Sequence, residues 1–100
     1  MPDPRIHPIE RANDTHAGVT GASTIIVPAN EERADLEIVN DLAVVVYLSR
    51  SAPAVVGDGI KLVQNGSYTM DTQNLFLGDI HAICNQGEDG SVTISEGEWG

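Results

Sequence analysis

The chain has 100 residues, which is enough for one domain and too few for two. Five lysines and arginines against fifteen aspartates and glutamates give a formal net charge of −10. This balance makes nucleic acid an unfavourable partner and disfavours an anionic membrane surface, because both would repel the chain. No apolar run approaches the roughly 20 residues that span a bilayer. The single cysteine, Cys84, leaves no intramolecular disulfide and no cysteine-rich zinc site.

The first 22 residues differ in composition from the rest of the chain. Prolines at positions 2, 4 and 8 each remove a backbone donor and fix φ, which disfavours both a helix and a central strand. We therefore expect residues 1–22 to form an extended N-terminal arm and residues 23–100 to form a folded domain. The arm is either a leader without a role or a tail that becomes ordered against a neighbour. In the second case the contacting side chains would be Arg5, Ile6, Ile9 and Arg11.

From Ser23 onward, short apolar runs alternate with turn residues. In residues 34–40, Leu36 and Ile38 alternate with acidic residues, which is the period-two pattern of a half-buried strand. Residues 30–36 are the only helix candidate, and they conflict with this pattern. The expected strands cover residues 23–27, 34–40, 43–49, 60–62, 67–70, 75–77, 79–85 and 91–95. Seven or eight short strands at this spacing predict an all-β fold with a single antiparallel β-sandwich or a barrel.

Residues 43–49 form the strongest expected strand, and both of its faces are apolar. Val45 and Tyr47 point opposite to the face that carries Val46, so their face needs a cover from another sheet or subunit. Because the chain has few aromatic residues, its core is thin, and we expect a homo-oligomer, with a trimer favoured over a dimer. Trp99 either closes the sandwich or anchors a partner. The expected core consists of Leu36, Ile38, Val44, Val46, Leu48, Ile80, Ala82, Val92 and Ile94.

Three features of the sequence are candidates for a catalytic or metal-binding site. His81 lies two residues after Asp79 on one strand face, but no nucleophile motif accompanies the pair. Cys84 shares a face with apolar residues, which is typical of a small buried hydrophobic residue. The turn at residues 87–90 lacks the ligand spacing of a calcium loop. We therefore expect no catalytic residue, no cofactor and no metal.

Several of these strand and turn segments together carry a resemblance to a known family. They are Arg33, Leu36–Asn40, Val46–Leu48, Gly59–Leu62, Gly66–Tyr68, Gly78–Ile83 and Val92–Ile94. Over residues 24–96 this pattern resembles the small β-sandwich proteins that decorate, or cement, the capsids of tailed bacteriophages and form head-fibre modules. The resemblance implies a jelly-roll-like fold, no catalysis, and a virion protein made in the host cytoplasm. It also implies binding to the exterior of a major capsid protein lattice as a dimer or trimer.

Three other interpretations remain open at the level of sequence. The first is a tail, fibre or baseplate component of the virion. The second is a carbohydrate-binding β-sandwich module, which would normally display several exposed aromatic side chains. The third is an enzyme, for which an activity abolished by His81→Ala would be the discriminating observation.

Overall fold

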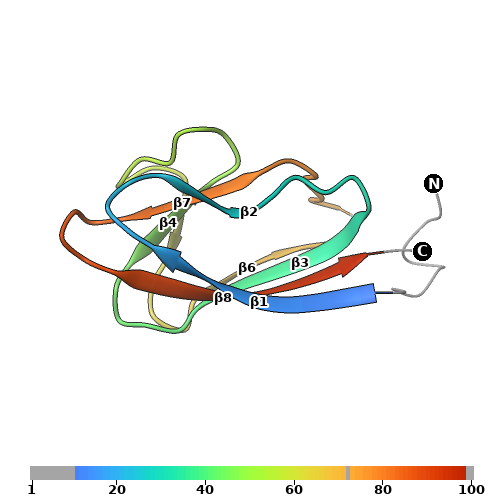
Figure 1. Cartoon of the computed structure of the whole chain (residues 1–100), viewed down its shortest axis with the longest axis horizontal. Coiled ribbons are helices and arrows are strands. Elements are labelled where there is room, and N and C mark those ends of the chain that lie inside the picture. The colour runs from blue at the N-terminus through green and yellow to red at the C-terminus, as the bar shows by residue number, and fades with distance from the viewer. Residues whose placement is uncertain (1–10, 72, 99–100) are drawn as a thin grey trace.

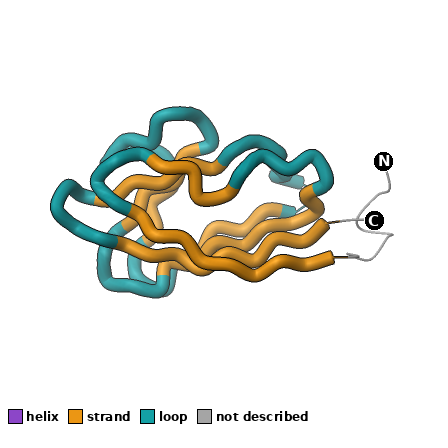
Figure 2. Tube along the Cα trace, in the orientation of Figure 1, coloured by secondary structure: helices purple, strands orange, loops and turns teal. Residues whose placement is uncertain are grey.

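The computed structural model describes residues 11–71 and 73–98, and within them the chain is all-β (Figures 1 and 2). The strands, in chain order, are β1 (Arg11–Val19), β2 (Thr24–Val27), β3 (Arg33–Asn40), β4 (Val46–Ser49), β5 (Ile60–Leu62), β6 (Ser67–Met70), β7 (Ile80–Cys84) and β8 (Gly90–Glu98). No helix capable of crossing a membrane occurs in these described residues.

The strands form two four-stranded antiparallel sheets, with the orders β1-β8-β3-β6 and β2-β7-β4-β5. β1 pairs with β8, β3 with β6 and β4 with β5, while β2 pairs with β7 in the facing sheet. This nesting is a long antiparallel hairpin rolled up on itself, which is the eight-stranded jelly roll. Figure 1 shows the two layers, with β2, β7 and β4 above β1, β8 and β3. The expected antiparallel β-sandwich of jelly-roll type is confirmed.

The core lies between the two sheets and follows the alternation of each strand. In β4, Val46 and Leu48 are fully buried, and they face Ile38 of β3 and Ile94 of β8 in the same apolar cluster. All nine expected core residues belong to this cluster or pack against it; Val44 alone among them is only partly buried. The period-two pattern therefore identified the core correctly.

The expected arm is wrong over its second half. Arg11–Val19 forms β1, which pairs along its whole length with β8, and Val19 is fully buried in the core. The sandwich therefore includes residues before 23, and its described part starts with Arg11. The prolines that suggested an arm all lie before β1. The polar composition of β1 is that of an edge strand whose first six residues are exposed on both faces.

Two other expected segments have different structures. Residues 75–77 are a loop, so β1 takes their place among the eight strands. The helix candidate at residues 30–36 is a turn that leads into β3. The Asn30 side-chain oxygen accepts the backbone N–H of Glu32 (3.0 Å), and the Asn30 backbone carbonyl accepts the N–H of Arg33 (3.2 Å). Asn30 therefore starts a turn and not a helix.

A fully buried asparagine, Asn40, at the end of β3 connects the following loop to the end of β5. Its side-chain amide donates to the carbonyls of Val44 (2.8 Å) and Leu62 (2.9 Å), and its Oδ1 accepts the N–H of Leu42 (3.1 Å). All the polar groups of this side chain are thereby engaged, as burial requires. Asn40 holds the β3–β4 connection against the end of β5.

Candidate functional site

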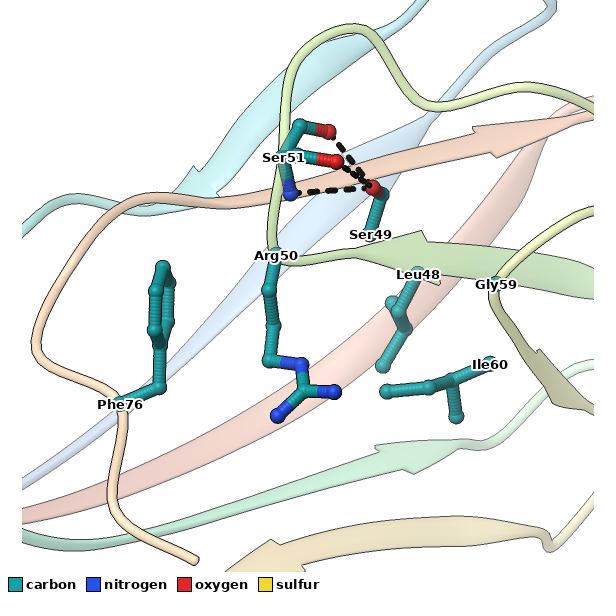
Figure 3. Close-up of a pocket in the computed structure, with 7 residues that line it drawn as sticks. All are labelled: Leu48, Ser49, Arg50, Ser51, Gly59, Ile60 and Phe76. Carbon is teal, nitrogen blue, oxygen red and sulfur yellow. Dashed lines mark hydrogen bonds between the residues drawn. The ribbon is translucent and has the colours of Figure 1, made fainter.

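A hollow of about 580 Å³ opens beside the ends of β4 and β5 and the loop before β7 (Figure 3). Leu48 and Ile60 provide an apolar floor, and Phe76 of the loop forms one wall. Arg50 extends from the end of β4 into the space between Phe76 and Ile60 (Figure 3). The hollow therefore combines apolar surface with one guanidinium group.

The cation in this hollow differs from the other arginines that the structure describes. Arg11 and Arg33 both form ion pairs with glutamates, whereas Arg50 has no ion-pair partner among the described residues. In a chain with a net charge of −10, an exposed guanidinium beside apolar surface suits a carboxylate with an apolar neighbour. The hollow is open and its arginine is exposed, so it offers a recognition surface and not an enclosed active site.

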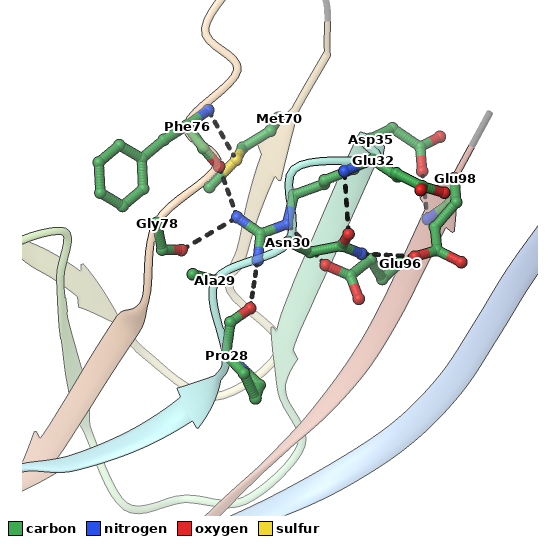
Figure 4. Close-up of polar contacts among 12 residues, drawn as sticks. Pro28, Ala29, Asn30, Glu32, Asp35, Met70, Phe76, Gly78, Glu96 and Glu98 are labelled. Atoms are coloured by element: carbon green, nitrogen blue, oxygen red, sulfur yellow. Dashed lines mark hydrogen bonds and ion pairs between the residues drawn. The ribbon is translucent and has the colours of Figure 1, made fainter.

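Phe76 is positioned by a buried arginine, Arg33, at the start of β3. Figure 4 shows the hydrogen bonds that reach Phe76, Gly78 and Pro28. The Arg33 side chain is fully buried and pairs with Glu96 of β8 through Nε (2.6 Å). Its other nitrogens donate to the carbonyls of Phe76, Gly78 (3.2 Å) and Pro28 (2.8 Å). One side chain thus fixes β8, the β2–β3 connection and the loop that carries Phe76.

A second layer of polar contacts surrounds this pair at the same end of the sandwich. Glu98 accepts from the Asn30 amide (2.7 Å) and from Arg11 Nε (3.2 Å), and Arg11 also contacts Glu32 (2.6 Å). Asp35 accepts the backbone N–H of residue 97 (2.9 Å). Glu98 and Asp35 thus help to close this end of the sandwich. Arg11 belongs to the sandwich and not to an arm.

The predicted oligomer face lies on the outer side of the β2-β7-β4-β5 sheet. Tyr47 points outward from β4, opposite Ile83 of β7 and Lys61 of β5 in the pairing register. Tyr47 is half-buried, and Val45 is half-buried just before the strand begins. The two residues are therefore accessible together with Ile83, and the structure contains no second copy that would show what covers them.

The outer side of the β1-β8-β3-β6 sheet has the opposite character. Short polar side chains cover it, and two shallow hollows of about 450 and 300 Å³ share Glu37 and Ser95. Asp14 of β1 lines the larger hollow and accepts a hydrogen bond from Ser95 Oγ (2.6 Å). The two broad faces of the sandwich thus present acidic, hydroxyl-rich surface on one side and mixed apolar surface on the other.

The structure separates the residues that sequence suggested as chemical groups. Asp79 Oδ1 accepts the backbone N–H of Ala29 (2.7 Å), while Nδ1 of His81 is buried and has no hydrogen-bond partner among the residues that the structure describes. The two side chains therefore do not form a base and its orienting acid. Cys84 is buried, and burial raises the pKa of its thiol above the ordinary value of 9.0. Its sulfur lies against the carbonyls of Val19 (3.5 Å) and Glu88 (3.2 Å).

The remaining predicted contact residues are mostly beyond what the structure describes. Arg5, Ile6, Ile9 and Trp99 all lie outside the described residues. Within residues 11–71 and 73–98, no group of three or more His, Cys, Asp or Glu side chains could hold a metal ion.

Sequence reasoning missed two polar residues that organise the fold, Arg33 and Asn40. A register shift in the β3–β8 pairing between Arg33 and Asp35 leaves both Arg33 and Ala34 buried, which simple alternation does not predict. For Asn40 the available signal is its position at the end of an apolar strand, next to Asp41, and this position is equally typical of an ordinary exposed turn.

Comparison with known proteins gives no assignment. No family model matches the chain, and no curated protein or solved structure matches it.

Proposed function

We propose that the protein is a non-enzymatic virion structural protein that decorates the outside of a tailed-phage capsid and stabilises it by bridging neighbouring capsid subunits. The observation that carries the proposal is the strand order, an eight-stranded jelly roll. This architecture is shared by viral capsid domains and lectins, and it agrees with what the sequence resemblance implies. Because a fold alone does not determine function, the surfaces supply the rest of the argument.

The charge distribution supports docking on a basic surface of a protein lattice. Of the five cationic residues in the chain, Arg11 and Arg33 are already paired with glutamates of the same molecule. The outer face of the β1-β8-β3-β6 sheet carries the carboxylates of Asp14 and Glu37 and is therefore acidic. Opposite charge would steer this face toward a basic patch. The Tyr47 and Ile83 face remains for contact with a neighbouring copy.

The N-terminal segment supplies the bridge in this proposal. Residues 1–10 precede β1, which is fixed in the sheet by its pairing with β8. The segment is therefore attached to the edge of the sandwich through Arg11. Ile6 and Ile9 would enter apolar pockets on a neighbouring subunit, and Arg5 would pair with a carboxylate there. Three prolines restrict the free segment, so ordering it costs less entropy than ordering a glycine-rich tail.

Stabilisation follows from mass action on the assembled shell. A ligand that binds only the assembled state stabilises it by RT ln(1 + [L]/Kd), which is about 2.7 kcal/mol per site at a hundredfold excess over Kd. Repetition over many lattice sites makes the shell harder to open. No covalent chemistry is required from the decorating protein.

The test is deletion of residues 1–10, followed by capsid binding and by the temperature at which capsids release DNA. The deletion stops before Arg11, because removing β1 would expose the sheet and take Val19 from the core. Circular dichroism and thermal unfolding control for an intact sandwich. The proposal predicts weaker binding and lost protection from the folded, truncated protein. If the full chain itself does not bind capsids, the function is wrong; if the truncated chain protects equally well, the bridging role of the segment is wrong.

A carbohydrate-binding module is the second candidate, because the larger hollow on the acidic face offers carboxylate and hydroxyl groups to sugar hydroxyls. Asp14, Glu37 and Thr93 line it. Calorimetric titration with a panel of soluble polysaccharides decides this alternative. Binding that is lost in Glu37→Ala would favour it over capsid decoration.

A further inference from the structure

β1 is an edge strand whose second side is paired with nothing that the structure describes. It has nine residues, whereas the other edge strands, β2, β5 and β6, have four, three and four. An edge strand presents a row of unpaired N–H and C=O groups, and a long one is a template for pairing with another chain. Among the described strands, β1 is therefore the strongest candidate for pairing between molecules.

Three features that often protect an edge, proline, lysine and a bulge, are missing from β1, although the strand does carry Arg11 and Asp14. The strand contains no proline and no lysine, and its pairing with β8 runs from Arg11 to Val19 without a bulge. The facing edge strand, β2, is less than half as long, and Asn13 and Thr15 on the inner side of β1 are exposed. The preceding ten residues contain three prolines, which cannot donate to a ladder, so this chain's own N-terminal segment is a poor cover.

We propose that β1 pairs with β1 of a second copy in an antiparallel, two-fold arrangement, which joins the two β1-β8-β3-β6 sheets into one continuous eight-stranded sheet. Two-fold pairing that keeps both cores on the same side requires residues of the same face to lie opposite each other. Centring the pair on Thr15 achieves this and overlaps all nine residues. This proposal is independent of the capsid function.

The polar side chains of β1 select this register. With Thr15 opposite Thr15, Asp14 of each copy lies opposite His16 of the other on the outer face, so a carboxylate acceptor faces an imidazole donor at two positions of the dimer. Shifting the centre to Asp14 would place two aspartates opposite each other, and shifting it to His16 would oppose two histidines. A two-fold axis placed between two residues would set inner-face residues of one copy opposite outer-face residues of the other. The remaining side chains near the centre, such as Ala17 opposite Asn13, are short and leave room for close approach.

The experiment measures the dimer dissociation constant by sedimentation equilibrium at neutral pH for the full chain and matched variants. Thr15→Lys places two lysines opposite each other at the centre, and we expect at least a tenfold weaker dimer, roughly the effect of converting a neutral pair to a like-charge pair on both strands. Thr69→Lys on β6 makes the same charge change at an exposed position of the opposite edge, and it should leave the dimer unchanged. Thermal unfolding shows that each variant is folded.

A charge reversal tests the register separately. His16→Asp sets an aspartate opposite Asp14 at both equivalent positions of the interface. This like-charge contact should weaken the dimer about tenfold. Adding Asp14→His to the same chain again sets a carboxylate opposite an imidazole at both positions and should restore the dimer. A wild-type protein that stays monomeric at all concentrations overturns the proposal. So does a dimer that Thr15→Lys leaves intact, that Thr69→Lys weakens equally, or that the reversed pair does not restore.

Discussion

Replacing Arg33 with methionine tests the structural centre of the fold. The side chain is fully buried, and its partner Glu96 is 17 % exposed. Methionine keeps much of the volume but removes the charge and every donor. The change leaves a largely buried carboxylate without its counter-ion and removes the donor from the carbonyls of Phe76, Gly78 and Pro28. Breaking a buried ion pair on one side costs about 3–5 kcal/mol.

That cost is a large part of the stability of a domain of this size, which lies at about 5–15 kcal/mol. With about 4–8 °C per kcal/mol for a small domain, the melting temperature should fall by roughly 12–40 °C. The matched control is Arg11→Met, which removes the same guanidinium group from ion pairs with Glu32 and Glu98. The Arg11 side chain is largely exposed. It should cost less than about 1 kcal/mol.

Urea unfolding followed by far-UV circular dichroism measures both variants. A double variant, Arg33→Met with Glu96→Gln, should recover part of the loss, because it also removes the orphaned carboxylate. If Arg33→Met and Arg11→Met destabilise the protein equally, Arg33 does not hold the end of the sandwich together and the packing described here is wrong.

Three further changes have defined outcomes. Val46→Ala opens a cavity in the core and should cost about 1–3 kcal/mol in urea unfolding. Gly59→Ala should destabilise clearly more than Gly57→Ala: both glycines have φ near +90°, but only at Gly59 would a Cβ meet an atom, the Leu48 carbonyl oxygen at 2.3 Å. The raised pKa of Cys84 means that the folded state disfavours the thiolate; the free energy of unfolding should therefore fall as pH rises through the unfolded value near 9.0, and Cys84→Ala should lack this component.

Alternation of apolar residues was sufficient to predict the sandwich and its core. Strands such as β3 and β8 bury one face, so Leu36, Ile38, Val92 and Ile94 appear at every second position and identify their own environment. The turn between β5 and β6 also suits its residues: the Gly66 N–H donates to the Val63 carbonyl (2.8 Å), and Asn65, at the third position of this turn, has a positive φ of 66°.

β1 was not predictable by the same means. Its first six residues are exposed on both faces, so no burial pattern marks them, and the strand is defined by pairing with β8, which is distant in sequence. The preceding prolines made the whole N-terminal region resemble an arm. Local composition can report a proline-rich segment, but it cannot report that a polar segment completes a sheet.

The polar centre around Arg33 was hidden for a different reason. Its burial depends on the register shift between Arg33 and Asp35, and its partners lie in three separate loops and strands. The loop with Phe76, interpreted as a strand from its apolar residues, is held by contacts from Arg33 and Met70. Such contacts are tertiary, and sequence spacing contains no signal for them.

Immunogold electron microscopy most directly tests the proposed role. Under the proposal the gene belongs to a tailed phage, and an antibody raised against this protein would be applied to intact particles of that phage. Capsid decoration predicts gold on the outer surface of the head, in many copies per particle, and loss of the label in particles that lack the gene. Gold confined to the tail or baseplate, or particles without label that nevertheless contain all their other structural proteins, would contradict the account.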